Sequence, residues 1–512
     1  MGRITLFVLS RPADDASRHV MEQLRPHAGE LIVIEYGGLA AAFGEHAGMA
    51  DEVVITDDSW FGPFSSFDEV FARAGASTAR AWMLGEFGEP MMIGLRAPLP
   101  DFPAESLRSI AATVRAEALY APGEAPGLPR RLLTDAPLEL DREASAARWT
   151  LDAAARSGYP VEHVWSSLVG SVQPRVLNAN GGMLEILPSS DLVYDPQRAL
   201  TIAAIAHVYY EDMTAELLAR LAALPTPFDL VVTTTDDSKA EVIRATIAAW
   251  QDPNLRHSEV RVLESNRGRD QSAFYVGCRD ILLDKQYDLV IKIHSKRSPQ
   301  NEVTGRYFRR QQLDNLLASQ EYASSVLALF QRESRLGIVF PPMIHSGLPT
   351  MGEGWFANRE PAALALRRLG IDSPIDDASP LAPYGGMFIA RREAIAALAE
   401  EPWSWDEYPN GDEYADGTLG HVQERLPVYA AAARGFHART VATRAYAGMS
   451  HAMLEYKLDR MSSGIPGYAA DQVQTVQSRM LVEEGRLTAI GRKVDSSRRD
   501  AILFALKKLF RR

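Results

Sequence analysis

Apolar runs and amphipathic segments alternate regularly in the middle of the chain. The apolar runs are typical of buried strands, and the segments between them have the spacing of helices. The predicted strands are residues 201–210, 228–237, 259–266 and 287–294, and the predicted helices are at about 214–224, 239–250 and 270–283. Strands that alternate with helices favour a parallel, doubly wound sheet, so the expected fold class is α/β.

A smaller α/β unit is predicted at the start of the chain. Its strands are expected at residues 4–9, 30–34 and 52–56, with a helix at about 14–26. The third strand runs into TDDSWFGP, where paired carboxylates and aromatic residues lie at a strand exit, and open α/β sheets bind ligands at such exits. The alternative is structural: Asp57 and Asp58 cap the next turn, and Trp60 and Phe61 pack beneath it.

Composition changes between these two units. Proline and glycine are concentrated at residues 121–137, which predicts a linker or a domain edge, and a helix is expected at about 141–157. The expected division is a small α/β unit at 1–130, a helical or mixed connector at 131–195, the main α/β domain at 196–455 and a helical C-terminal region at 456–512.

The end of the chain has the pattern of a basic amphipathic helix. One face carries apolar residues and the opposite face carries cations. The apolar residues are Ile502, Leu503, Leu506, Leu509 and Phe510, and the cations are Lys507, Lys508, Arg511 and Arg512. Such a helix predicts peripheral contact with anionic lipid through residues 500–512. A bundle helix that covers an apolar surface fits the same pattern.

Charge and cysteine content exclude several classes of protein. The chain has 512 residues and a formal net charge of −12, and broad nucleic-acid binding needs an extended basic surface, so no nucleic-acid partner is expected. Cys278 is the single cysteine, which excludes an intrachain disulfide and a cysteine-based zinc cluster. The first apolar run is too short for a signal peptide, and no stretch approaches the roughly 18 apolar residues of a membrane span. We therefore expect a cytoplasmic protein.

Polar residues follow each of the four central strands. The carboxyl ends of parallel strands lie at one edge of the sheet, so these side chains are expected to converge on one crevice and to bind the substrate there. They are His207, Tyr209, Asp236, Asp237, Asn266, Arg267, Gly268, Arg269, Asp270, Lys292, His294, Lys296 and Arg297.

Two of these groups have a specific expected role. Asp236 and Asp237 precede a helix and are placed to accept hydrogen bonds from a base or a ribose, although capping the helix is an equal alternative. The sequence NRGRD, residues 266–270, carries two arginines on a glycine turn into a helix N-terminus, a combination that suits an anion. Its alternative is an ordinary turn with solvated arginines.

The fourth strand is interrupted by charge, because DLVIKIHSKRSPQ places Lys292, His294 and Lys296 on one face. A buried lysine without a partner loses its charge or costs several kcal/mol, roughly, so Lys292 needs an anion. That anion is either a ligand phosphate or a protein carboxylate, for which Asp270 and Asp288 are the candidates.

Four segments in order, NRGRD, YDLVIKIHSKRS, YGGMFIARREAI and DGTLGHVQERL, resemble the rhamnan synthesis protein F family of glycosyltransferases. The resemblance runs from about residue 200 to 453, and TDDSWFGP also resembles a segment of this family. It implies a GT-A-like fold and makes the N-terminal unit a candidate degenerate copy of the transferase domain.

In GT-A enzymes an Asp-x-Asp motif at the fourth strand holds a divalent metal against the donor diphosphate. This sequence has His294, Ser295 and Lys296 at the matching place. The resemblance therefore implies transfer without a cofactor, in which Lys292, Lys296 and Arg297 compensate the phosphate charge. A bound magnesium or manganese ion is the alternative.

The second half of the resemblance assigns the acceptor side. Tyr384, Gly385 and Gly386 would line the sugar pocket, since glycine lets the backbone approach a ligand closely. Asp416 matches the family's segment and is the predicted general base of an inverting transfer, with Asp412 and Glu413 as the fallback. Asp416 is also a candidate N-cap of the following helix.

The implied function is transfer of a deoxyhexose from a dTDP-L-rhamnose-like donor to a growing polysaccharide or lipid-linked glycan. The choice of rhamnose comes from the resemblance alone. That function would place the enzyme in the cytoplasm, at the inner membrane face. The leading alternative is a non-catalytic module that binds glycans or nucleotide sugars. A nucleotidyltransferase is disfavoured, because HVYYEDMT, after the first strand, lacks the glycine-rich, lysine-containing loop that such an enzyme needs.

Overall fold

The structure is a computed structural model of the chain. It describes residues 3–475 apart from short breaks at 87, 100–105, 122–123, 125, 141–142, 298–301, 347–351, 411–412, 414 and 469–470. Residues 3–448 of this range belong to one compact unit, and a second unit begins at Met449.

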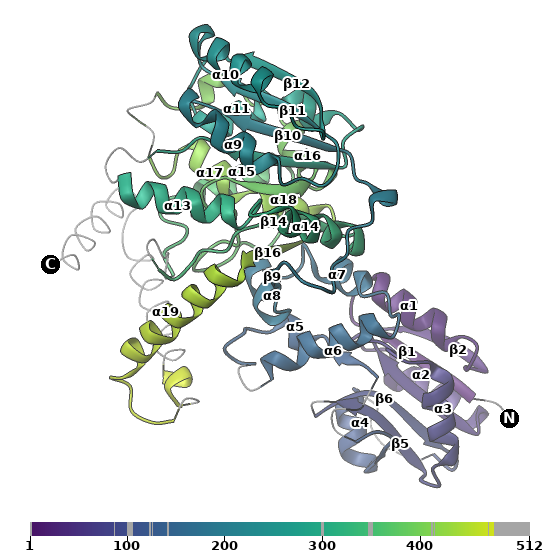
Figure 1. Cartoon of the computed structure of the whole chain (residues 1–512). Coiled ribbons are helices and arrows are strands. Elements are labelled where there is room, and N and C mark those ends of the chain that lie inside the picture. The colour runs from purple at the N-terminus through teal and green to yellow at the C-terminus, as the bar shows by residue number, and fades with distance from the viewer. Residues whose placement is uncertain are drawn as a thin grey trace. The chain divides into compact units, whose positions relative to one another are not determined.

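The described part of the first unit is built around a sheet of eight strands in the order β12-β11-β10-β13-β15-β14-β16-β9 (Figure 1). Strand β15 is antiparallel to both of its neighbours, and the other pairs are parallel. The strands are β9 (Leu184–Leu187), β10 (Ile202–His207), β11 (Phe228–Thr234), β12 (Leu255–Val262), β13 (Leu289–His294), β14 (Leu336–Phe340), β15 (Phe388–Arg391) and β16 (His437–Thr443). This GT-A-like, mostly parallel sheet confirms the expected fold class.

Helices cover both faces of this sheet, and residue alternation assigns each face to its own core. In β10, Ile202 and Ala204 pack into one apolar cluster, whereas Ala203 and Ile205 pack into the other. The first cluster contains residues of α9 (Thr214–Leu221), α10 (Asp237–Ala249), α13 (Glu302–Asp314) and α14 (Gln320–Arg332). The second contains residues of α11 (Arg269–Tyr275), α12 (Arg279–Leu283), α15 (Arg359–Arg368), α16 (Arg392–Glu400), α17 (Leu419–Arg425) and α18 (Pro427–Ala433).

The prediction of one continuous helix at about residues 270–283 is wrong. Residues 270–283 form two short helices, α11 and α12, with Gly277 between them. A Cβ atom at Gly277 would lie 2.7 Å from the Ala273 carbonyl oxygen and 2.6 Å from the Leu263 side chain, so a larger residue at this break would force a shift of the backbone.

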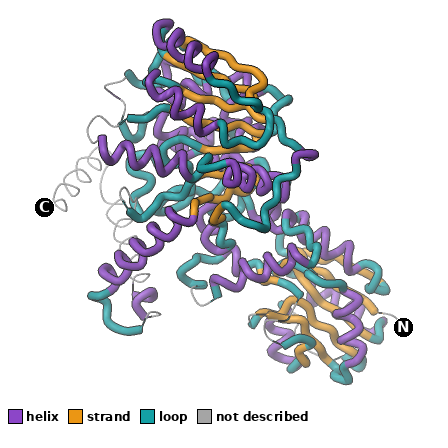
Figure 2. The backbone as a smooth tube through the Cα atoms, viewed as in Figure 1, coloured by secondary structure: helices purple, strands orange, loops and turns teal. Residues whose placement is uncertain are grey.

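The N-terminal sheet has the order β2-β1-β3-β6-β5-β7 and confirms the smaller α/β unit (Figure 2). Its strands are β1 (Arg3–Leu9), β2 (Glu30–Glu35), β3 (Glu52–Asp57), β5 (Ala81–Glu86), β6 (Glu89–Arg96) and β7 (Glu117–Ala118). Its helices are α1 (Asp15–Leu24), α2 (Leu39–His46), α3 (Phe67–Ala76) and α4 (Leu107–Val114).

At the exit of β3 the structure shows the capping arrangement. Asp57 accepts a hydrogen bond from the Ser59 amide at 3.0 Å, and Asp58 accepts one from the Ser10 hydroxyl at 2.7 Å. Trp60 and Phe61 are buried beneath them. Both carboxylates therefore already have protein partners.

In the described part of the proline- and glycine-rich stretch, β8 (Leu128–Pro129) pairs with β4 (Trp60–Phe61), and the domain edge expected there stays a prediction. The connector then continues through α5 (Arg131–Thr134), α6 (Ala144–Arg156), α7 (Glu162–Leu168) and α8 (Pro174–Asn180).

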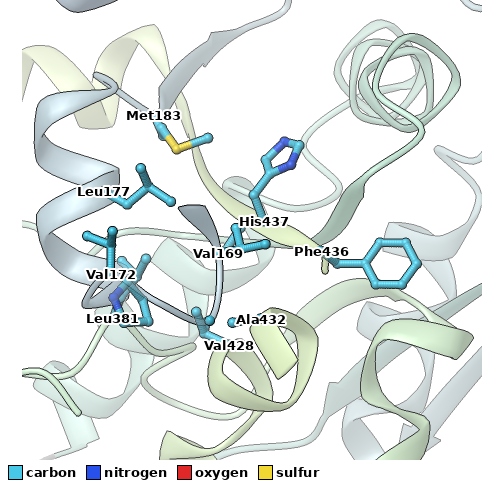
Figure 3. Close-up of a pocket in the computed structure, with 12 residues that line it drawn as sticks. Val169, Val172, Leu177, Met183, Leu381, Val428, Ala432, Phe436 and His437 are labelled. Carbon is cyan, nitrogen blue, oxygen red and sulfur yellow. The ribbon is translucent and has the colours of Figure 1, made fainter. Parts of the chain in front are cut away.

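The connector is fixed to the main domain at α8. The Arg175 amide donates to Asp376 at 2.8 Å, and apolar side chains from both sides surround a cavity of about 20 Å³ (Figure 3). Leu177 and Met183 face this cavity from the connector, and Val428 and Ala432 face it from α18. A cavity of this size holds about one water molecule, so the contact is close to fully packed.

The second unit is described as far as residue 475. Helix α19 (Arg444–Ser462) leads into it from β16. Among the described residues, no helix has both the length and the apolar character needed to cross a membrane. The basic amphipathic segment at 500–512 lies outside the described residues.

Candidate functional site

The exits of β10 and β13 meet directly, as the strand pattern predicts. His207 of β10 is in register with His294 of β13. Beyond this pair, the Ser295 hydroxyl accepts hydrogen bonds from the amides of Tyr209, at 2.9 Å, and Tyr210, at 3.2 Å. The two strand ends are therefore tied together at the edge where the predicted crevice lies.

The anion that balances Lys292 is a protein carboxylate. The Lys292 side chain is 2% exposed, and its Nζ donates to Asp270 Oδ2 at 2.6 Å and to the Gly386 carbonyl at 2.8 Å. Burial opposes ionisation of Asp270, but the charges of His294 and Lys292 outweigh it and hold the pKa of this carboxyl well below its ordinary value. Of the two alternatives for Lys292, the structure shows the ion pair.

Lys292 and His294 also hold the glycine turn that follows α15. His294 Nε2 lies 2.7 Å from the Gly385 carbonyl oxygen, beside the bond from Lys292 to the Gly386 carbonyl. From the opposite side, Glu424 Oε1 accepts a hydrogen bond from the Gly385 amide at 2.7 Å. The polar side chains of Lys292, His294 and Glu424 thus fix the backbone of Gly385 and Gly386, and we call this arrangement the turn clamp.

Only glycine fits at these two positions. The backbone φ angles are +91° at Gly385 and +75° at Gly386, in the left-handed region that side chains disfavour. A Cβ atom at Gly386 would lie 2.7 Å from Gln271 Nε2 and 3.1 Å from Lys292 Nζ. The neighbouring Tyr384 is buried, and its hydroxyl donates to the Pro380 carbonyl at 2.9 Å.

Glu424 is the residue of this site that sequence reasoning did not select. Its side chain is 14% exposed and forms an ion pair with Arg425 at 2.7 Å. Burial raises its pKa, but the charges of Arg425 and Lys296 and the Gly385 amide lower it more, so the pKa of Glu424 lies below its ordinary value. The sequence did contain a sign of this role, because Glu424 and Arg425 form a charged pair within the apolar pattern of α17 and α18.

Asp416, the predicted base, is the more accessible carboxylate. Its side chain is 45% exposed, and its Oδ1 accepts a hydrogen bond from Asn358 Nδ2 at 3.1 Å. Helix α17 begins at Leu419 with Thr418 in the N-cap position, so the expectation that Asp416 caps this helix is wrong. The Asn358 bond orients Asp416 instead. Of the fallback carboxylates, Asp412 lies outside the described residues, and the amide of Glu413 bonds the Asn410 carbonyl.

His207 is buried and neutral. Its Nδ1 lies 3.0 Å from the Thr233 hydroxyl, whereas Nε2 is buried without a partner among the described residues. Burial lowers the pKa of His207 to about 4. At neutral pH its Nε2 therefore remains available to one further hydrogen bond.

The carboxylates after β11 have the capping role in this structure. Asp236 is the N-cap of α10 and accepts a hydrogen bond from the Lys239 amide at 3.0 Å, while Asp237 is the first residue of the helix. Lys239 in turn places its Nζ 4.3 Å from the centre of the Tyr209 ring. A contact of Asp236 or Asp237 with a base or ribose stays a prediction.

The NRGRD turn is held from the segment before α17. Gly268 has φ +78°, and a Cβ atom there would lie 2.2 Å from the Tyr408 ring. The Arg267 guanidinium donates to Asp406 at 2.9 Å and to Asn410 at 3.0 Å. Asn266 and Arg269, on the other hand, are exposed. The turn thus joins the two halves of the domain, and anion binding by its arginines stays a prediction.

Two cations follow β13. Arg297 pairs with Asp212 and lies over the Tyr210 ring. Lys296 has its Nζ 4.8 Å from the centre of the Phe308 ring, and no carboxylate among the described residues lies within ion-pair distance of it. Lys296 is therefore the cation at this strand end that is free to meet an anionic ligand.

The residues at the strand end do not fit a divalent metal. At the place where a carboxylate pair is expected, the chain has His294, whose Nε2 is engaged by the glycine turn. No group of three or more histidine, cysteine, aspartate or glutamate side chains within the described ranges is arranged to hold a metal ion.

Comparison with known proteins gives a family match over most of the chain. The model of the family described as rhamnan synthesis protein F matches residues 110–436, which begins well before the expected start near residue 200 and includes the connector. Two curated relatives from two strains of Xanthomonas campestris pv. campestris, both described as uncharacterized protein WxcX, are each 29% identical over 238 residues. This segment covers 46% of the present chain and about a third, 32%, of each relative.

A solved structure is also similar at low level. It is the mannosyltransferase PcManGT from Pyrobaculum calidifontis in complex with GDP-Man and Mn2+. The sequences are 14% identical, the TM-score is 0.29, and the alignment covers 72% of this chain and 92% of the other. The fold of the main domain rests on the strand order of its sheet.

Proposed function

The chain belongs to the rhamnan synthesis protein F family, and on this premise we propose that it transfers a sugar from a nucleotide-diphosphate donor to a glycan acceptor. The donor we propose is dTDP-L-rhamnose or a close analogue, and the acceptor is a growing polysaccharide or lipid-linked glycan. The sugar and the acceptor follow from the family and not from the geometry of the site.

One observation carries the proposal. The glycine turn at Gly385 and Gly386 is clamped against the exits of β10 and β13, and beside it lies Lys296, which has no ion-pair partner in the part of the chain that the structure describes. A Cβ atom at Gly385 would lie 2.9 Å from the Phe308 ring, and Lys296 Nζ lies 4.8 Å from the centre of that same ring, so the cation is close to the turn. A rigid backbone turn beside a free cation at a strand exit is suited to hold a sugar next to a phosphate.

The reaction we propose is a single displacement. The acceptor hydroxyl oxygen forms a bond to the anomeric carbon while the bond from that carbon to the diphosphate oxygen breaks, so the configuration inverts. Asp416 takes the hydroxyl proton, a role that its exposed and oriented carboxylate permits. The nucleotide diphosphate leaves with the bonding electron pair, and Lys296 compensates the charge that develops on it.

In this assignment the three cations at the strand end have different roles. Lys292 is already balanced by Asp270, so it holds the turn and takes no part in phosphate binding. Arg297 has Asp212 as a partner and would need to exchange it for a phosphate. In this proposal Lys296, rather than a metal ion, therefore compensates the negative charge that develops on the departing diphosphate.

A non-catalytic binding module is the second candidate, and the lack of a carboxylate pair at the end of β13 favours it. Such a module would bind the nucleotide sugar at the same crevice but would release no nucleotide diphosphate.

A nucleotide-sugar screen tests the function. Because a ligand that binds the folded state raises the melting temperature, dTDP-L-rhamnose should raise it more than UDP-glucose or GDP-mannose do. The donor that stabilises the protein is then incubated with a rhamnose-containing oligosaccharide, and release of the nucleotide diphosphate is followed. Stabilisation by a donor with no release of nucleotide diphosphate, either with or without the acceptor, would support the binding module. Failure of every donor to stabilise the protein would contradict both candidates.

A further inference from the structure

A second, larger cavity lies at the opposite end of the main sheet's strands from the candidate site. Strands β14 and β16 run parallel to β13, and the cavity is lined by His437 and Arg439 at the start of β16 and by Arg335 just before β14. His294 and the glycine turn lie at the other end of these strands. The connector helices α6 and α7 form the opposite wall. The cavity has a volume of about 560 Å³, and we call it the junction pocket.

A continuous hydrogen-bonded network lines this pocket. Arg148 of α6 donates to Glu185 of β9 at 3.1 Å, and Arg439 donates to the same Glu185 oxygen at 2.9 Å. Arg439 also donates to Glu333 at 2.7 Å. His437 Nε2 lies 2.9 Å from that same Glu333 oxygen. The network joins α6 in one wall to β9, β16 and the end of α14 in the other, and it fixes planar donors and acceptors around the pocket.

One polar atom of this network is left without a partner. Burial lowers the pKa of His437, so the ring is neutral, and Nε2 carries the proton that is donated to Glu333. Its Nδ1 is then an acceptor, and it is buried with no hydrogen-bond partner among the described residues. A buried acceptor without a partner is unfavourable, and a ligand hydroxyl that reached this edge of the ring would satisfy it.

The charge of the lining selects the ligand class. Five arginines and five carboxylates line the pocket, so with a neutral His437 the lining has no net charge. A phosphate or other anion would meet as many carboxylates as guanidinium groups, and a cation would meet the reverse. A neutral ligand rich in hydroxyl groups can use both kinds of group, since each hydroxyl both donates and accepts.

Size and apolar surface agree with such a ligand. The volume lies in the range of about 300–1,000 Å³ that small-molecule sites span. Trp165 and Tyr159 line the pocket among the charged groups, and Trp165 lies against His437 with the ring centres 5.5 Å apart. Aromatic rings beside fixed hydrogen-bonding groups fit the mixed polar and apolar surface of a sugar.

We propose that the junction pocket is a second glycan-binding site, which takes a neutral oligosaccharide segment apart from the crevice where transfer is proposed. The choice of rhamnose as a probe rests on the proposed function. Binding at the junction pocket itself requires no transfer, so the two proposals fail separately.

The test uses a substitution that fills the pocket without touching the network. Ala155 lies on the face of α6 that lines the pocket and is exposed, so an indole at this position occupies the cavity. Ala153 is exposed on the same helix and does not line the pocket, because two residues along a helix turn the side chain by about 200°. Ala153→Trp is therefore the matched control for Ala155→Trp.

Binding of two neutral disaccharides, one of rhamnose and one of mannose, is measured by calorimetry. Hydrogen exchange of the segment 148–165 is measured with and without each sugar. At least one of the two should bind wild type and Ala153→Trp equally, protect this segment, and bind Ala155→Trp roughly tenfold more weakly or worse with no protection. A disaccharide of glucuronic acid and free dTDP should leave the segment unchanged.

Three results would overturn the second site. They are no binding of either neutral sugar to wild type, protection that persists in Ala155→Trp, and protection by the charged probes as strong as by the neutral ones. If the segment is protected as expected while no donor yields nucleotide diphosphate, the second site stands and the transferase proposal falls.

Discussion

At the scale of single residues, the candidate site is organised by charges that serve the protein backbone. Lys292 and His294 have the appearance of ligand-binding residues in the sequence, but their polar atoms are used on Asp270, Gly385 and Gly386. Glu424 completes the hold from the other side. A turn fixed in this way is preorganised, so a bound sugar loses less free energy to ordering the protein.

Replacement of Gly386 by alanine tests how closely this turn is packed. Any non-glycine residue at its φ of +75° costs roughly 1–2 kcal/mol, and the clash with Gln271 and Lys292 adds about 1–3 kcal/mol. Gly370→Ala is the control, because Gly370 has φ +67° but nothing within 4 Å of the position of its Cβ. Urea unfolding should show a larger loss for Gly386→Ala. Equal losses of unfolding free energy in the two variants would mean that Gln271 and Lys292 move aside at no cost, and that the turn clamp is not tightly packed.

His207 should make stability depend on pH. Its folded-state pKa of about 4 lies below the ordinary value of about 6.5, so the unfolded chain binds a proton that the folded chain does not. The stability from this group is complete above pH 6.5 or so and is lost as the pH falls toward 4, by up to roughly 3 kcal/mol.

Urea unfolding of His207→Gln between these pH values should therefore show a shallower loss than wild type. Exposed His451→Gln controls for the removal of one imidazole. If all three proteins lose stability with the same slope, the imidazole of His207 is not held in its neutral form.

At the scale of elements, the end of β13 and the start of α17 define the chemistry. Strand β13 runs between β10 and β15, so both of its edges are paired and only its exit can present groups to a ligand. Helix α17 begins after Asp416 and carries Glu424 near its end. One helix thus supplies the carboxylate that holds the turn, and the segment before it supplies the carboxylate proposed as the base.

Asp416→Asn separates catalysis from folding. The amide keeps the size of the side chain and can still accept the bond from Asn358, so the melting temperature should change little. Turnover should fall by about 10²–10⁴-fold if the carboxylate removes the acceptor proton. Glu413→Gln is the matched control and should retain turnover. Turnover of Asp416→Asn at the wild-type rate would exclude the base role and direct attention to Glu424.

The end of β13 predicts activity without a metal. Where a metal site would need carboxylates, the chain presents His294, Ser295 and Lys296, so transfer should persist after exhaustive chelation. Lys296→Met should then lower turnover strongly, since it removes the free cation. Activity that disappears with chelation and returns only with added magnesium or manganese would contradict metal-free compensation.

At the scale of the whole molecule, the described part of the first compact unit combines two α/β sheets and a helical connector. The family match includes the connector, and the junction pocket lies where the connector meets the main domain. The connector is therefore part of the unit that the family model describes.

The C-terminal segment predicts membrane contact. Four cations on one face of the segment 500–512 should attract anionic lipid, at about 1 kcal/mol each near the surface, while the apolar face inserts. The full chain should co-sediment with vesicles that contain phosphatidylserine, and a chain that lacks 496–512 should not. Vesicles of phosphatidylcholine alone serve as the control. Equal sedimentation of the two chains with anionic vesicles would show that the segment is not an anchor.

The sequence by itself determined the layers of the main domain and the edge where the site lies. Alternation within residues 201–294 sorts side chains onto two faces, and polar residues after each strand mark one sheet edge, because both patterns depend only on local geometry. The same reasoning placed Lys292 and His294 on one face, and it stated that Lys292 needs an anion.

Only the tertiary structure decided which partners these residues have. Asp270 reaches Lys292 from another element, and Glu424 reaches Gly385 from a third, and no local pattern encodes such a distance. The junction pocket has the same origin, since Arg148, Glu185 and Arg439 are far apart in the chain and meet only through packing. Local periodicity fixes the direction of a side chain, whereas burial and charge pairing across the fold fix what it contacts.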